Sequence, residues 1–249
     1  MRSNVPATLL FAFAACLWTV ASASWTSAAA RDAAVLAVTW QPAFCETKPR
    51  KPECRDQDAK RYDADHFALH GLWPQKRRAY CGNGPLVRRA RKGGSWSRLP
   101  GIGLDETLRE PLLRVMPGAL SYLHRHEWWK HGTCYAKDAT SYYRDAIALM
   151  AALNRSQVRH LFAERVGREV TTRDIRAAFD TAFGPGAGRR VKVRCRRDGD
   201  RQLIVELQIG LQGNIPREAA RGDLRRLIRA SRPVRPDCPG GIVDPVGFQ

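Results

Sequence analysis

Short stretches of the chain have the apolar spacing of β-strands. Residues 35–40 and 66–72 are rich in apolar side chains, which is typical of buried strands, and the second would deliver His70 at its end, where a Gly-Leu-Trp-Pro turn begins. Apolar residues also alternate with polar ones in 191–195 and in 203–211, on either side of Asp198-Gly199. This pattern indicates a β-hairpin.

Other stretches have the spacing of helices. Apolar residues recur every three or four positions in 108–113, 143–153, 158–162 and 175–182, as on the buried face of an amphipathic helix. Pro111 should interrupt the first of these. Thr171 or Thr172 should cap the last, and Gly184 and the residues after it should end it. A further helix is expected from Ala119 onward, and residues 82–104, rich in Gly, Pro and Arg, are expected to form a loop.

Strands and helices are mixed without a regular β-α-β alternation, and neither an internal repeat nor a long linker divides the chain. The pattern favours an α+β fold, with a largely antiparallel β-sheet flanked by helices. At 249 residues the chain is long enough to bury a full core in one domain.

The first residues have the composition of an export signal. Arg2 precedes an apolar run over 7–20, which is short for a membrane span, and the run ends in Ala21-Ser22-Ala23. We expect cleavage after Ala23, with the alanines at 28–30 as a second candidate, so that 1–23 is a signal peptide and 24–249 the mature domain. A lipid anchor on Cys16 is disfavoured because apolar residues continue beyond it. A secreted or periplasmic protein is expected.

Six cysteines remain once Cys16 is removed with the signal: Cys45, Cys54, Cys81, Cys134, Cys195 and Cys238. An even number in an exported chain predicts disulfides, although ~15 pairings are possible from the count alone.

The formal net charge is +18, and it falls only to +17 without the signal because Arg2 is the only charged residue in it. Such a charge favours a polyanionic partner such as RNA. Arg-rich segments that merely keep the protein soluble would explain the charge equally well.

Residues 126–134, His-Glu-Trp-Trp-Lys-His-Gly-Thr-Cys, place several chemically active side chains close together. On an α-helix with about 100° per residue, His126, Glu127, Lys130 and His131 fall within an arc of roughly 140°. Two imidazoles, a carboxylate and an ammonium on one face suit acid-base chemistry on a phosphodiester. A zinc site is disfavoured because the histidines are five residues apart, whereas the zinc-protease helix spaces them by four.

A second stretch, 65–75, contains His-Gly-Leu-Trp-Pro. With both stretches in this order, each followed by a cysteine, the sequence resembles the ribonuclease T2 family of secreted endoribonucleases. The two stretches match the two active-site signatures of that family without interruption. The resemblance extends to Trp-Gln-Pro-x-Phe-Cys at 40–45 and to the C-terminal cysteines.

The resemblance implies the roles of the site residues and needs no cofactor or metal. His131 would be the general base and His70 the general acid, while His126, Glu127 and Lys130 would hold and polarise the phosphate. The reaction would convert single-stranded RNA to a 2′,3′-cyclic phosphate, which water then opens to a 3′-phosphate. The family pattern also favours disulfides between Cys45 and Cys54, Cys81 and Cys134, and Cys195 and Cys238. We expect a monomer.

Base recognition is less strongly marked. Trp73 and Tyr80 are candidate stacking surfaces for nucleobases, because an aromatic face accepts any base. Trp73 could instead belong to the core. Gln75 stands where a number of family members carry an acidic residue that contacts the base, which argues for broad specificity. His66, His124 and His160 are expected to be structural or surface residues.

Three other functions fit part of the sequence. A basic binding module without catalysis would explain the charge, and an inactive relative acting as an extracellular signal would explain the fold. The binding module and the inactive relative both predict loss of acid-base residues, yet His70, His126, Glu127, Lys130 and His131 are all present. A DNA phosphodiesterase would need a metal or a separate nucleophile, and no ligand cluster stands out in the sequence.

Overall fold

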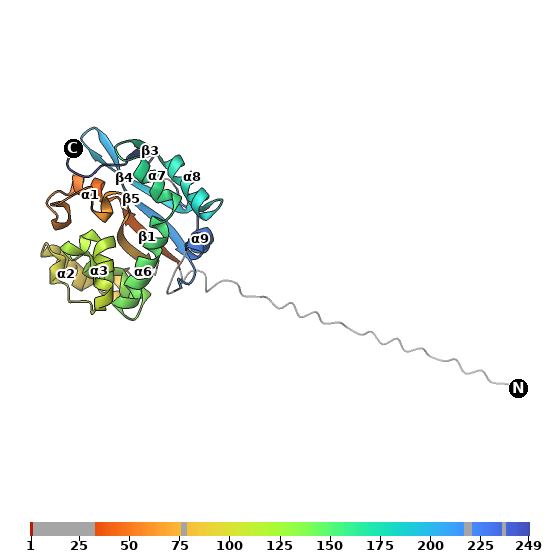
Figure 1. The fold of residues 1–249 in the computed structure, drawn as a ribbon. Coiled ribbons are helices and arrows are strands. Elements are labelled where there is room, and N and C mark those ends of the chain that lie inside the picture. The colour runs from red at the N-terminus through yellow and green to blue at the C-terminus, as the bar shows by residue number, and fades with distance from the viewer. Residues whose placement is uncertain (2–32, 76–78, 217–220, 236–237) are drawn as a thin grey trace.

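The computed structural model describes Met1 and residues 33–75, 79–216, 221–235 and 238–249. Its six-stranded sheet (Figure 1) has the order β2-β1-β5-β6-β3, with β4 paired to β5. Most neighbouring strands run antiparallel, and β5 and β6 pair in parallel. This mixed, largely antiparallel sheet with its helices confirms the α+β prediction. The strands are β1 Ala33–Thr39, β2 Ala68–Pro74, β3 Glu169–Thr171, β4 Val191–Asp198, β5 Arg201–Gln212 and β6 Gly240–Ile242.

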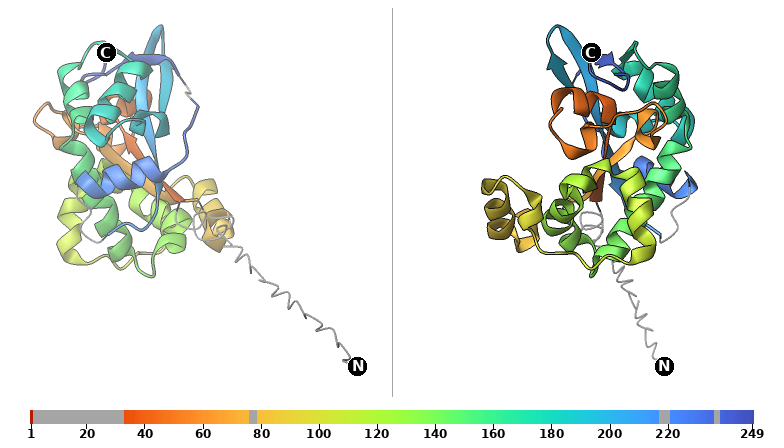
Figure 2. Two further views of the ribbon diagram at one scale, coloured as in Figure 1. Left: turned by 90° about the vertical axis from the view of Figure 1, so that its right-hand side faces the viewer. Right: turned by 60° about the vertical axis from the view of Figure 1, so that its left-hand side comes forward.

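Helices pack against the sheet and against one another. Contacts of α6 with β2 and α9, and of α9 with α8 and β5, form one helical layer (Figures 1 and 2). The α-helices are α1 Gln41–Thr47, α2 Gly84–Lys92, α3 Glu106–Val115, α4 Leu123–Glu127, α5 Thr133–Tyr135, α6 Ala139–Asn154, α7 Gln157–Glu164, α8 Thr172–Phe183 and α9 Arg221–Ala230. The π-helix is η6 Trp128–Gly132. The 3₁₀ turns are η1 Pro52–Cys54, η2 Tyr62–Ala64, η3 Ala79–Gly82, η4 Trp96–Arg98, η5 Pro117–Ser121 and η7 Ala187–Arg190.

The hairpin and the amphipathic helices lie where their sequence patterns predict. Strands β4 and β5 pair from Val191 with Ile209 to Asp198 with Arg201. Thr171, one of the two candidate caps of α8, accepts from the backbone N–H of Asp174, whose side chain reaches back to the N–H of Thr171. This reciprocal capping box satisfies two N–H groups that the first helical turn leaves unpaired.

Three local predictions are wrong. Residues 82–104 are not all loop, because α2 buries Val87 and Ala90, three positions apart, while its arginines face outward. Pro111 lies inside α3 without ending it. The helix expected from Ala119 begins only at Leu123, because Tyr122 adopts a left-handed conformation (φ 62°) that ends the preceding turn η5.

The second strand also differs from its prediction. It begins at Ala68 rather than at residue 66, and it continues to Pro74. Gly-Leu-Trp-Pro is therefore part of β2, paired with β1, and not a turn. His70 lies within the strand and not at its end.

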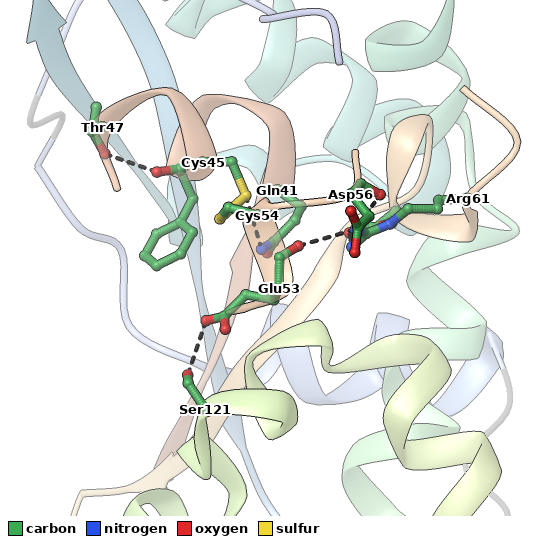
Figure 3. The surroundings of a disulfide bond; sticks show 10 residues. Gln41, Cys45, Thr47, Glu53, Cys54, Asp56, Arg61 and Ser121 are labelled. Atoms are coloured by element: carbon green, nitrogen blue, oxygen red, sulfur yellow. Dashed lines mark hydrogen bonds and ion pairs between the residues drawn. A yellow bond between two sulfur atoms is a disulfide. The ribbon is translucent and has the colours of Figure 1, made fainter. Parts of the chain in front are cut away.

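Disulfides join the same cysteine pairs that the family resemblance implies: Cys45 with Cys54, Cys81 with Cys134 and Cys195 with Cys238. The first bridge fastens α1 to η1 (Figure 3). Beside it, the Ser121 hydroxyl donates to Glu53 Oε1 at 3.0 Å. Since Ser121 closes the turn before α4, this bond ties the start of the second signature helix to the disulfide-bonded segment.

The predicted signal peptide, 1–23, lies outside the described residues apart from Met1. Within the described part of the chain, the helices are all too short or too polar to cross a membrane.

Candidate active site

His70 occupies a β-bulge in β2. In the pairing with β1, Leu69 lies opposite Val38 and Gly71 opposite Ala37, so His70 is an extra residue with no partner of its own. A bulge redirects the side chain that it carries, and bulges are common next to active sites. The mostly apolar strand can therefore present a polar imidazole, 35% exposed, toward the second signature.

The second signature spans a change of helix type. His126 and Glu127 end α4, and Lys130 and His131 lie in the π-helix η6. A π-helix bonds residue i to i+5, and single π turns are frequent at functional sites. The buried Trp128 ring packs near Tyr142 of α6, with ring centroids 6.0 Å apart. This contact anchors the helix to the core, while its histidines stay partly exposed.

Glu127 lies at the centre of the site. Its carboxylate is 1% exposed and accepts from the indole N–H of Trp73 at 2.7 Å. Its other oxygen lies 3.8 Å from Nε2 of His70 and 3.8 Å from Nε2 of His126. One buried carboxylate therefore brings together side chains from both signatures.

Two glycines of the signatures are required by close packing. A Cβ on Gly71 would overlap the Glu127 carboxylate and the Trp73 indole nitrogen. A Cβ on Gly132 would overlap the Trp128 ring. Neither glycine has an unusual backbone conformation, so the requirement is one of space.

The two candidate base-stacking residues lie at the site. The Trp73 ring meets the His70 ring edge-on at 5.1 Å between centroids and stacks on the His131 ring at 5.5 Å. Tyr80 has a positive φ of 54°, and the centroid of its ring lies 5.8 Å from Nζ of Lys130. Trp73 is half-buried and hydrogen-bonded within the site, so it is more than a core residue. Contact with a base stays a prediction for both.

Two residues at the site were not predicted from the sequence. Glu206 of β5 places Oε2 at 2.5 Å from Nδ1 of His70. Trp96 stacks on the His126 ring, with centroids 4.0 Å apart and an interplanar angle of 21°. The sequence signal for Glu206 is a single acidic residue in an otherwise apolar strand, and Trp96 lies in the segment 82–104 that is predicted to be loop.

The histidines outside the site have structural surroundings. His66 stacks on Tyr62 and pairs with Asp65. The backbone carbonyl of His124 accepts from the Tyr143 hydroxyl. The third, His160, is exposed on α7.

The histidines of the second signature favour the neutral state. Burial, followed by the charge of Lys130, lowers the pKa of His131 to about 3. Burial and Lys130 also lower the pKa of His126 to about 3. A neutral imidazole has a lone pair free to accept a proton.

His70 favours the charged state. Burial lowers its pKa, but the hydrogen bond to Glu206 and the charges of Glu127 and Glu206 outweigh burial, so the pKa of His70 is raised. Burial also raises the pKa of Glu127, against the opposing effects of His70, Trp73 and Lys130. Burial also raises the pKa of Glu206. The hydrogen bond and charge interaction with His70 outweigh burial, so the pKa of Glu206 is lowered.

A cavity of about 620 Å³ opens beside the cluster and is lined by both His70 and Glu206. Trp96 forms part of its wall. Four basic residues line the same space: Lys48, Lys51, Arg194 and Arg196. In the described part of the chain, no three His, Cys, Asp or Glu side chains are grouped to hold a metal ion.

Comparison with known proteins gives the family. The model of the ribonuclease T2 family matches residues 31–219. Ribonuclease I of Escherichia coli (strain K12) is 30% identical over 205 residues, which cover 74% of this chain and 76% of that protein. A ribonuclease of Aeromonas hydrophila is 33% identical over 103 residues, 41% of this chain and 37% of that protein.

Solved structures share the fold. A mutant of ribonuclease MC1 aligns with a TM-score of 0.50 at 22% identity, covering 73% of this chain and 89% of that one. The S3-RNase of Japanese pear aligns with a TM-score of 0.50 at 20% identity, covering 77% and 87%. The match to the family model, which spans well over half of the chain, shows that this protein belongs to the ribonuclease T2 family and is an endoribonuclease of that type.

Proposed function

We propose that this enzyme cleaves single-stranded RNA in two steps without a metal ion. The 2′-hydroxyl first attacks the adjacent phosphorus, giving a 2′,3′-cyclic phosphate and releasing the 5′-oxygen, and water then opens the ring to a 3′-phosphate. The substrate carries its own nucleophile, so the protein needs only a base, an acid and cations. The observation that carries the proposal is the gathering of His70, His126 and Trp73 around the buried carboxylate of Glu127.

In this proposal the two imidazoles have opposite roles. His131, with its lowered pKa, is neutral and accepts the proton of the 2′-hydroxyl. His70, with its raised pKa, is protonated and donates to the departing 5′-oxygen. Two titratable groups whose surroundings move their pKa values apart form a natural acid and base pair. In the second step the two residues exchange roles.

The remaining polar residues would act on the phosphate. As phosphorus becomes pentacoordinate, its equatorial oxygens gain negative charge, which a fixed cation stabilises. Lys130 supplies that charge, and a neutral His126 supplies a hydrogen bond. Glu127 keeps His126 and His70 in place through its contacts with both.

We propose broad base specificity. Trp73 and Tyr80 offer aromatic surfaces, and stacking on such surfaces is tolerant of sequence. The Gln75 side chain is exposed and donates to the carbonyl of Trp73. The Gln75 amide is neutral and already hydrogen-bonded to Trp73, so it gives no reason to expect a preference for one base.

The positive charge supports an RNA substrate, and the cysteines support an exported enzyme. The lysines and arginines that line the cavity beside His70 would attract the RNA backbone. Three disulfides suit an oxidising compartment, and together with the export signal they support a secreted or periplasmic enzyme.

Digestion of homopolymeric RNAs with and without a chelator tests the proposal. We expect all four homopolymers to be cut in the presence of chelator, with early products ending in 2′,3′-cyclic phosphate. DNA and 2′-O-methyl RNA should bind competitively but stay intact, because they lack the attacking hydroxyl. Loss of cleavage on chelation, or cleavage of DNA at a comparable rate, would contradict the mechanism.

A further inference from the structure

A side-chain contact joins β2, the strand that carries His70, to the hairpin strand β5 across the intervening strand β1. The ring nitrogen Nδ1 of His70 lies 2.5 Å from Oε2 of Glu206, 136 residues further along the chain. Thr39 of β1 is in register with Glu206 on one side and with Ala68, two residues before His70, on the other. The contact therefore forms only when all three strands have paired.

The backbone is irregular at both ends of this contact. His70 is the extra residue of the bulge in β2. In β5, Arg194 pairs with Glu206 and Cys195 with Ile204, so Val205 is the extra residue of a second bulge next to Glu206. Bulges alter the direction of neighbouring side chains. Two of them here direct an imidazole and a carboxylate toward each other.

Glu206 is itself held in place. Gln208, two residues along β5, donates from Nε2 to Oε1 of Glu206 at 2.7 Å. The carboxylate is 14% exposed, and the nearby charge of Arg194 favours its ionised form. An ionised carboxylate only accepts hydrogen bonds, so Nδ1 of His70 must carry a proton and donate it.

We propose that Glu206 is a positioning residue that fixes the orientation and protonation state of His70. Because Nδ1 is held by Glu206, Nε2 is the nitrogen that exchanges a proton with the substrate. In the first step His70 gives its Nε2 proton to the departing 5′-oxygen and becomes neutral, with Nδ1–H still bonded to Glu206. In the second step Nε2 takes a proton from the attacking water. This inference rests on the proposed function.

Other charged groups also face His70 and affect its pKa, so a test of Glu206 must leave them unchanged. Glu127 from α4 raises its pKa and Lys130 from η6 lowers it. His126 and His131 on the same helical segment also interact with it electrostatically. Replacing Glu206 by Gln leaves all of these in place and removes only the ionised acceptor at Nδ1.

The experiment compares Glu206→Gln and Glu206→Asp with the wild-type enzyme. The matched control is Glu169→Gln, which removes one negative charge from an exposed position in β3. The dependence of kcat/KM on pH is measured with single-stranded RNA, and the pKa of His70 is followed separately by NMR. Thermal unfolding confirms that each variant is folded.

We expect the basic limb of the Glu206→Gln profile to move to lower pH by about 1 to 3 units, the range for loss of a close opposite charge. The pKa of His70 should fall by the same amount. Glu206→Asp should recover part of the shift, and Glu169→Gln should match the wild type. A purely structural glutamate would change only the unfolding temperature.

The outcomes separate this inference from the proposed function. If the wild type forms cyclic phosphate and the Glu206→Gln profile and His70 pKa are unchanged, the positioning role is wrong while the reaction stands. If the wild type forms no cyclic phosphate, the proposed function is wrong. The NMR titration then still decides whether Glu206 controls the protonation of His70.

Discussion

The two histidines proposed to carry the reaction stand in opposite electrostatic surroundings. His70 extends from a strand, with carboxylates of Glu127 and Glu206 near its two ring nitrogens. His131 extends from a π-helix beside Lys130, and its ring stacks on Trp73. Burial lowers the pKa of both imidazoles. The neighbouring charges then reverse that effect at one residue and add to it at the other.

In the proposed mechanism, this difference would let one site provide an acid and a base from the same type of side chain. Two histidines in equivalent surroundings would titrate together, and the acid and base forms would coexist only near their shared pKa of ~6.5. Here the two carboxylates favour the charged form of the His70 ring, while burial and the charge of Lys130 favour the neutral form of the His131 ring. Glu127 lies between His70 and His126, and its Oε1 is 3.8 Å from Nε2 of His70, too far for a normal hydrogen bond.

Removing either imidazole should have the largest effect. We expect His70→Ala and His131→Ala each to lower kcat by ~10²-fold to 10⁴-fold, the contribution of a positioned acid or base, with a smaller change in RNA binding. The control is His160→Ala, an exposed histidine of α7. Near wild-type turnover in either active-site variant would remove that residue from the mechanism.

Disturbing Glu127, which lies beside both His70 and His126, should rank next. In Gly71→Ala the new methyl group would overlap the Glu127 carboxylate and displace it. A shift of about 1 Å in a catalytic group is enough to cost ~10²-fold in turnover. Gly222→Ala, where nothing lies within 4 Å of the added Cβ, is the matched control. Equal activities would mean that Glu127 does not hold the site together.

Removing the positive charge of Lys130 should move both limbs of the kcat/KM profile to higher pH. The charge of Lys130 lowers the pKa of His131 and that of His70. Its loss in Lys130→Met should therefore move both limbs of the kcat/KM profile to higher pH, by about one unit, besides lowering turnover. Lys137→Met, at an exposed position, should leave the profile unchanged. A lower turnover with unmoved limbs would limit Lys130 to binding phosphate.

The bridge between the two signatures should affect the chemistry least. Cys81 and Cys134 close a loop of 53 residues and Cys45 and Cys54 one of 9. If a disulfide stabilises by restricting the unfolded chain, replacing both cysteines by Ser should lower the free energy of unfolding by about 4 kcal/mol for Cys81–Cys134 and about 2.5 kcal/mol for Cys45–Cys54. Urea denaturation measures both losses, and equal losses would contradict that account. Turnover of the folded variants should stay close to that of the wild type.

Features set by local pattern were predictable from the sequence. The hairpin formed by β4 and β5 follows from the alternation of apolar residues on either side of Asp198-Gly199. Helix α8 follows from apolar residues at every third or fourth position, ended by a glycine. The two signatures pointed to five residues that the fold does bring to one site. Their proposed roles still await the kinetic tests above.

Other features depend on contacts between distant residues, which no local pattern records. The bulge that aims His70 exists only in the pairing of β2 with β1. Glu206 looks like any polar residue of a half-buried strand until β5 lies beside β1. The helix α2 was missed because Val87 and Ala90 are a weak apolar face among arginines and glycines, and only packing makes them decisive.

A titration of the wild-type histidines by NMR tests the central comparison most directly. We predict that the ring of His70 titrates above pH 6.5, whereas the ring of His131 stays neutral until the pH approaches about 3. Assignment of the two resonances comes from the His70→Ala and His131→Ala variants. Titration of both rings at one common pH, or of His131 above His70, would contradict the division into acid and base.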